Sequence, residues 1–146
     1  MTARKEVWQC SVAWRWVLQF VRENDLDGLS TQDVVTQIVI PRTLEKQVRY
    51  VDLIPPNCVS SPTYFVSHVW GCPFLDLVAS IQSALGLNED DEKSAETFLW
   101  IDIFAVNQHR TNNEQASDLM SLHKAIQQSS AATLVCIDVN GKLLTR

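Results

Sequence analysis

The sequence predicts an α/β protein with a parallel β-sheet and an N-terminal helical segment, and three observations predict this fold class. The chain has 146 residues, about the size of one domain. Apolar residues make up 46% of it and charged residues 20%, so the chain can bury a core. After position 62, three apolar, strand-like runs alternate with two stretches of helical period, an order that favours parallel strands joined by right-handed crossovers.

The first expected element is a helix over residues 5–24. Apolar residues recur there at spacings of three and four, and they form two stripes: Val7, Cys10, Trp14, Val17, Leu18 and Val21; and Trp8, Val12, Trp16 and Phe20. A helix that is apolar on most of its circumference must be covered on two sides. Arginines and tryptophans mix here, which also allows a membrane-surface interpretation. Because the polar face is narrow, we favour packing within the protein or against a partner.

Ser30 is expected to open a second helix, because its hydroxyl can accept the backbone N–H of Asp33. Pro41 should end this helix, since a residue before proline is pushed out of the helical region. Prolines and serines then dominate residues 55–62, which indicates an extended linker. We therefore expect residues 1–62 to be a helical lead-in and linker, ahead of a partial α/β domain over residues 63–146.

That domain is expected to begin with a short buried strand over residues 64–66, which runs into a polar loop. A helix follows over residues 74–85. Pro73 suits the start of this helix and Gly86 lies just past its end, the usual asymmetry of helix ends.

The second strand is expected over residues 97–106, with one carboxylate inside it. A helix over 114–129 and a third apolar strand over 132–137 complete the pattern. Four apolar residues of that helix are expected to face inward: Leu119, Leu122, Ala125 and Ile126.

Composition excludes several classes of function. The net charge of −5 has the wrong sign for a protein that neutralises phosphates, so nucleic acid is not an expected partner. The four cysteines lie far apart without a C-x-x-C pair, which predicts reduced thiols and no metal site. The N-terminus has no secretory signal pattern and no apolar run is long enough to span a bilayer. We expect a cytoplasmic protein.

Polar residues follow the first two expected strands of the domain. Ser67, His68 and Trp70 come after the first, and Asp102 and Asn107 lie in and after the second. Ligands of open parallel sheets bind beyond the carboxyl ends of the strands, so these five residues are the candidate lining of one crevice. Three of them also have a purely structural interpretation. His68 could be a hydrogen-bonded loop residue, Asp102 a buried carboxylate satisfied by hydrogen bonds, and Trp70 a core residue.

Other site types have little support in the sequence. Neither a P-loop nor a dinucleotide-binding fingerprint occurs. Glu114, at the start of an expected helix, is a weak candidate for a catalytic acid, because a favourable charge in the first helical turn explains it as well.

Three segments resemble the Toll/interleukin-receptor (TIR) superfamily, in particular its TIR-like and heterokaryon-incompatibility (HET) branch. They are TYFVSHVWG (63–71), which carries S-x-x-W-G; FLWIDIFAVNQH (98–109), which carries W-I-D-x-x-x-x-N-Q; and DLMSLHKAIQQSSAATLVCID (118–138). Their order is that of the family. The first 62 residues resemble, more loosely, the helical lead-in of algal and protist proteins with a YFVSHxW strand.

The resemblance implies a flavodoxin-like fold of five parallel strands, association with a second copy or another TIR/HET-like protein, and in many relatives cleavage of NAD. The family's catalytic glutamate lies in a W-C-x-x-E pattern on the helix after the third strand. Here no glutamate follows Glu114, so the module would lack that carboxylate and two strands. A signalling or interaction module without complete catalytic machinery is therefore expected.

The alternative is an NAD glycohydrolase that uses Asp102 or a carboxylate from a partner. NAD would then be its substrate, and we expect no bound cofactor.

Overall fold

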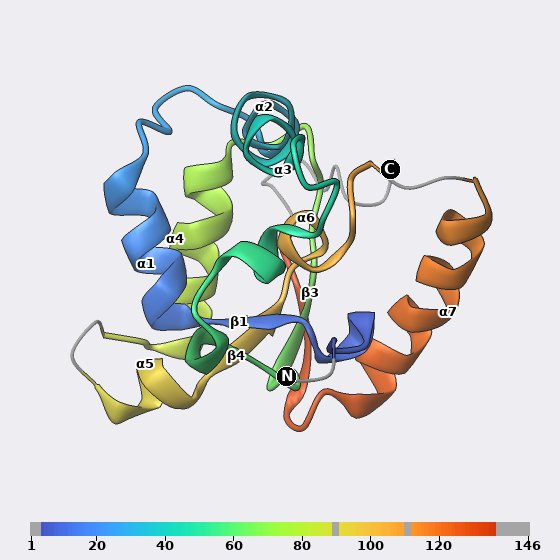
Figure 1. The fold of residues 1–146 in the computed structure, drawn as a ribbon. Coiled ribbons are helices and arrows are strands. Elements are labelled where there is room, and N and C mark those ends of the chain that lie inside the picture. The colour runs from blue at the N-terminus through green and yellow to red at the C-terminus, as the bar shows by residue number, and fades with distance from the viewer. Residues whose placement is uncertain (1–3, 89–90, 110–111, 137–146) are drawn as a thin grey trace.

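The computed structural model describes residues 4–88, 91–109 and 112–136, and Figure 1 shows their arrangement. The strands are β1 (Ser11–Ala13), β2 (Val59–Ser60), β3 (Tyr64–Ser67), β4 (Phe98–Trp100) and β5 (Ala132–Val135). The α-helices are α1 (Trp14–Glu23), α2 (Thr31–Val34), α3 (Ile40–Thr43), α4 (Phe74–Leu85), α5 (Glu92–Glu96), α6 (Asp102–Ala105) and α7 (Asn112–Gln128). Short 3-10 turns are η1 (Val7–Gln9), η3 (Tyr50–Leu53) and η4 (Pro56–Cys58), and η2 (Val35–Val39) is a π-helical turn.

The five strands form one sheet in the order β2-β1-β4-β3-β5. Strand β3 runs parallel to β4 on one side and to β5 on the other, which confirms the parallel arrangement expected of the three C-terminal strands. Strand β1 is antiparallel to both β4 and β2, so the sheet is mixed rather than wholly parallel. The α/β class is therefore confirmed, with two antiparallel pairings, both made by β1, that the sequence did not predict.

The expected helix over residues 5–24 is wrong in its first half. Residues Ser11–Ala13 form β1, and the helix α1 begins only at Trp14. The backbone N–H of Trp14 donates to the carbonyl of Thr97 at 2.9 Å, so the chain leaves the sheet at this point. Residues Cys10 to Trp14 are all buried, so this stretch suits a strand covered on both faces as well as a helix, and pairing with β4 decides between them.

The expected stop at Pro41 is also wrong. The capping contacts between Ser30 and Asp33 form as expected, but the helix then continues from α2 through η2 into α3, with Pro41 in the first turn of α3. A proline clashes with the carbonyl four residues earlier in a regular helix. The wider π-helical turn just before it relieves that clash, so the chain stays helical to Thr43.

Helices cover both faces of the sheet. Helices α1 and α4 lie on one side of the strands and α7 lies on the other, as Figure 1 shows. Helix α4 connects β3 to β4, and α7 precedes β5. The expected helix over 74–85 is confirmed, and Gly86 ends it with a φ of 60°, the left-handed conformation that glycine adopts without a steric penalty.

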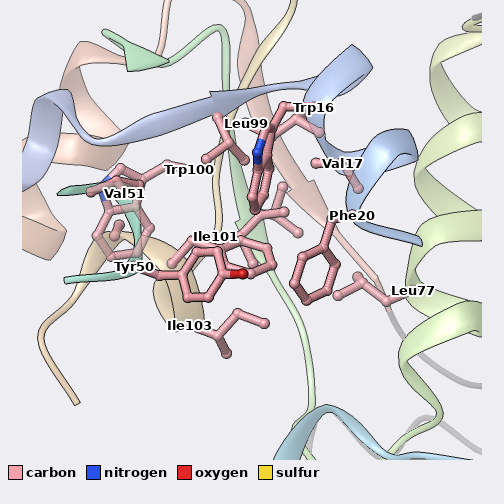
Figure 2. Close-up of a cluster of buried hydrophobic side chains, with 14 of the residues drawn as sticks. Trp16, Val17, Phe20, Tyr50, Val51, Leu77, Leu99, Trp100, Ile101 and Ile103 are labelled. Atoms are coloured by element: carbon pink, nitrogen blue, oxygen red, sulfur yellow. The ribbon is translucent and has the colours of Figure 1, made fainter. Parts of the chain in front are cut away.

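The core joins the N-terminal and C-terminal parts of the chain. Aromatic rings from both parts pack edge to face, among them Trp16 against Phe104 at 5.0 Å and Phe20 against Phe74 at 6.0 Å. Figure 2 shows Trp16, Phe20 and Tyr50 gathered over the strand residues of β4. Residues on both sides of position 62 thus contribute to one sheet and one core.

The C-terminal elements agree with the sequence in order but not in every bound. The second strand of the expected domain ends at Trp100, and residues 102–105 form the single turn α6 instead of continuing the strand. Helix α7 and strand β5 form where they were expected. Within α7, Ala125 is buried, whereas Ile126 is 41% exposed and so does not face inward as expected.

Candidate functional site

The structure brings three of the five expected lining residues together. The Nε2 atom of His68 lies 3.4 Å from Oδ1 of Asp102, and the indole N–H of Trp70 donates to Oδ2 of Asp102 at 3.0 Å. The side chain of His68 is 3% exposed and that of Asp102 is 22% exposed. We call these three residues the Asp102 cluster.

Parallel pairing explains why these side chains meet. Strands β3 and β4 run in the same direction, so the residues that follow them emerge at the same edge of the sheet. His68 and Trp70 follow the end of β3, and Asp102 is the first residue of α6, just beyond β4. A carboxylate in the first turn of a helix is favoured by the partial positive charge of the backbone N–H groups there.

The start of helix α2 is hydrogen-bonded to the loop that carries His68 and Trp70. The backbone N–H of Gln32 donates to the carbonyl of Trp70 at 2.9 Å, and that of Thr31 donates to the carbonyl of Cys72 at 3.0 Å. The first helical N–H groups have no partner within their own helix, so this loop satisfies two of them. The N-terminal part of the chain therefore fixes the geometry of the Asp102 cluster.

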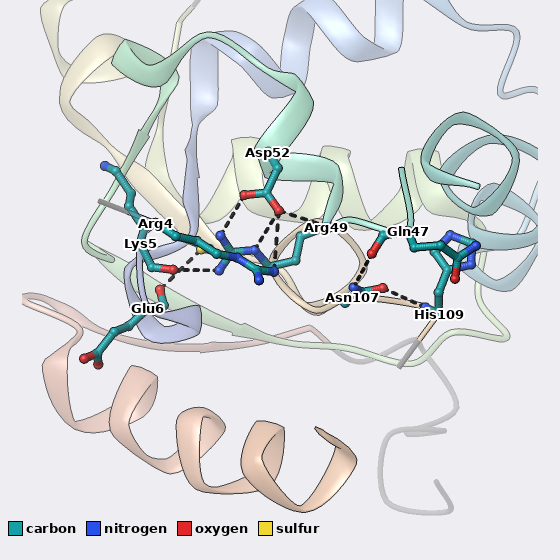
Figure 3. A network of polar contacts seen from close by, with 9 residues as sticks. Arg4, Lys5, Glu6, Gln47, Arg49, Asp52, Asn107 and His109 are labelled. Carbon is teal, nitrogen blue, oxygen red and sulfur yellow. Dashed lines mark hydrogen bonds and ion pairs between the residues drawn. The ribbon is translucent and has the colours of Figure 1, made fainter. Parts of the chain in front are cut away.

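Ser67 and Asn107 make other contacts. The carbonyl of Ser67 accepts the backbone N–H of Cys136 at 2.8 Å, which ties the end of β3 to the chain just after β5. The side-chain amide of Asn107 donates to the carbonyl of Gln47 at 2.8 Å and accepts the backbone N–H of His109 at 2.8 Å (Figure 3). These contacts join Asn107 to the segment after α3.

Glu114, the weak catalytic candidate, lies near the start of α7. The contacts of its side chain lie outside the part of the chain that the structure describes.

The Asp102 cluster is a carboxylate and an imidazole held together, with an indole that fixes the carboxylate. The partly exposed carboxylate can stabilise a nearby positive charge. Within residues 4–88, 91–109 and 112–136, no three His, Cys, Asp or Glu side chains gather in a way that would hold a metal ion.

A second polar cluster, around Arg49 and Asp52, was not predicted from the sequence (Figure 3). The Arg49 guanidinium donates to both carboxylate oxygens of Asp52, from Nε at 3.0 Å and from Nη2 at 2.7 Å. The three-residue spacing that joins them on one turn was present in the sequence, but nothing there showed that the arginine would be buried.

No protein-family model matches the chain, and neither the curated proteins nor the solved structures that were compared with it give a match. Of the helices in the described part of the chain, none combines the length and the apolar character that crossing a membrane requires.

Proposed function

We propose that this chain is a cytoplasmic TIR/HET-like signalling module that acts by associating with a second copy, or with another protein of this kind, rather than by catalysis. The observation that carries the proposal is the outer edge of the sheet, where no strand of the described residues pairs with β5 on its far side. Strand β5 is the last strand in the sheet order, and its Val135 is 58% exposed. An uncovered edge strand offers backbone groups for pairing, and apolar side chains beside it add surface for a partner.

The order of the parallel strands supports a flavodoxin-like assignment. Across the sheet they lie as β4, β3 and β5, that is second, first and third along the chain. The flavodoxin-like order 2-1-3-4-5 begins in the same way. In that order a fourth strand lies beside the third, so the outer edge of β5 is where a sheet of this kind accepts a further strand.

The contacts of Asp102 support binding without catalysis. One of its carboxylate oxygens accepts the indole N–H of Trp70, and the other faces the His68 ring. A carboxylate with these protein partners is held as a structural group, and a substrate would have to compete with those partners for it.

The four cysteines are free, as expected of a protein in a reducing compartment, which supports the cytoplasmic part of the proposal.

The self-association proposal is tested by size-exclusion chromatography with light scattering. We expect the wild-type protein to form dimers or larger species, and we expect Val135→Lys to yield monomers, because a lysine on the edge blocks pairing. Leu44→Lys is the matched control, since Leu44 is 56% exposed and lies just after α3, outside the sheet. A monomeric wild-type protein at high concentration would overturn the proposal, as would Val135→Lys oligomers of unchanged size.

A second candidate function, NAD glycohydrolysis, is favoured by the partial exposure of Asp102 beyond the end of β4. Nicotinamide leaves as a neutral group, so no general acid is needed, and one carboxylate can stabilise the cationic sugar in the transition state.

The assay follows NAD consumption by the wild-type protein and by Asp102→Ala and Glu114→Ala variants, with the exposed Asp27→Ala as control. Turnover that disappears in either of the first two variants alone would overturn the non-catalytic proposal.

A further inference from the structure

We propose that a pocket beside β1 and β2 binds a small organic anion with an apolar body. The pocket has a volume of about 500 Å³. Cavities that hold small organic ligands measure about 300 to 1,000 Å³, so this one is large enough. It is lined by Arg4, Lys5, Cys10, Val48, Arg49, Val51, Asp52, Ile54, Pro56 and Val59. None of the residues of the Asp102 cluster lines it, so the inference is independent of the function proposed above.

The charge of the lining selects for an anion. Three cations, on Arg4, Lys5 and Arg49, line the pocket with a single carboxylate, Asp52. This local excess of positive charge occurs in a chain whose net charge is −5. Because clefts with low-dielectric walls focus such a field, an anionic ligand would be drawn to this pocket from a surface that otherwise repels it.

Two of the three cations are held in place by contacts within the protein, and the third, Arg4, is 65% exposed and lies 3.8 Å from the Asp52 carboxylate. Arg49 is 3% exposed, pairs with Asp52, and donates from Nη1 to the carbonyl of Lys5 at 2.8 Å (Figure 3). The ammonium of Lys5 donates to the carbonyl of Val59 at 2.7 Å, and an ammonium has three donors. Lys5 is thus anchored at the pocket wall in a position to meet an anion.

The remaining wall is apolar. Valine, isoleucine and proline side chains supply most of it, and Cys10, Val51 and Val59 are buried. Burial raises the pKa of the Cys10 thiol to about 11, so this group stays neutral and behaves as a small apolar side chain. A fully polar anion would leave this apolar wall without a matching surface, and an uncharged apolar ligand would place no negative charge beside the Lys5 ammonium. A carboxylate or phosphate monoester with a hydrocarbon body fits both.

Titration calorimetry with decanoate, decyl phosphate and decanol tests the inference. We expect one molecule of decanoate or decyl phosphate to bind per chain, at least about tenfold more tightly than decanol, and the better of the two anions identifies the head group. No binding of either anion, or decanol binding as tightly as both, would overturn the proposal.

Two pairs of variants locate the binding. Lys5→Gln keeps a donor for the Val59 carbonyl but removes the charge, and it should weaken anion binding about fivefold, as expected for one partly exposed ion pair. Ile54→Trp should fill the pocket and abolish binding. The matched controls are Lys46→Gln and Leu53→Trp, which change exposed residues outside the lining and should bind as the wild type does.

A nuclear magnetic resonance titration of the wild-type protein gives the same answer without variants. The amide signals of Cys10, Val51 and Val59 should shift on addition of decanoate, while those of His68 and Trp70 should not. Shifts confined to the Asp102 cluster, or anion binding that survives Ile54→Trp in a folded variant, would refute the assignment of this pocket.

Discussion

Removing the Asp52 carboxylate should destabilise the protein more than removing any exposed carboxylate. In Asp52→Ala the Arg49 guanidinium loses its two contacts with the carboxylate, and the backbone N–H of Arg49 loses a third contact at 3.2 Å. With 3% of its side chain exposed, Arg49 has little access to water as a substitute.

The size of the expected stability loss follows from the burial of Arg49. Breaking a buried ion pair by removing one partner costs about 3 to 5 kcal/mol. Asp52 itself is 25% exposed, so water weakens the pair in the wild type, and we expect a loss of about 2 to 3 kcal/mol in the free energy of unfolding. With a urea dependence of about 2 kcal/mol per M, the unfolding midpoint should fall by about 1 to 1.5 M.

The assay is urea unfolding followed by tryptophan fluorescence, with Asp27→Ala as the exposed control. The double variant Arg49→Met with Asp52→Ala removes the buried charge together with its partner, and should be no less stable than Asp52→Ala alone. A midpoint shift below about 0.3 M for Asp52→Ala would refute the reasoning, since it corresponds to the cost of an ordinary surface charge. The reasoning would also be refuted if the double variant lost as much unfolding free energy as the single variants Arg49→Met and Asp52→Ala lose together.

Three further predictions concern other parts of the molecule. Trp70→Phe removes the N–H that Asp102 accepts, and thermal unfolding should show a loss of about 1.5 to 3 kcal/mol, the usual worth of a hydrogen bond to a charged group; an unchanged melting temperature would contradict the contact. The pKa of Cys10 is raised to about 11 from 9.0, so the folded protein holds this proton more tightly than the unfolded chain, and the stability that it contributes below pH 9 should be lost as the pH rises towards 11. Cys10→Ala should flatten that part of a plot of stability against pH, and an identical slope in the variant would rule out the thiol as its source. Ser30→Ala removes the acceptor of the Asp33 N–H and should cost about 1 kcal/mol, measured by urea unfolding; a stability equal to the wild type would show that the capping contact contributes nothing.

The Asp102 cluster could be predicted in part from the pattern of residues in the sequence. Two apolar runs followed by polar residues were enough to predict that His68 and Asp102 would emerge at one edge of the sheet, because parallel strands end together. The pattern did not reveal that Trp70 would donate to Asp102, or that the Asn107 amide would join the segment after α3. Side-chain direction in a loop depends on neighbours that are distant in sequence, here Gln32 and Gln47.

By itself the sequence determined the α/β class, the helix over residues 74–85 with its glycine end, the Ser30 cap and the three parallel strands. Each of these depends on interactions within a few residues, or on a run of apolar residues that has only one suitable environment. The tertiary structure alone decided that Ser11–Ala13 would be a strand, that the helix would pass Pro41, and that Arg49 would be buried beside a pocket. Those outcomes depend on which distant surface each segment meets, because pairing with β4 and burial against the core outweigh the weak local preferences of the chain.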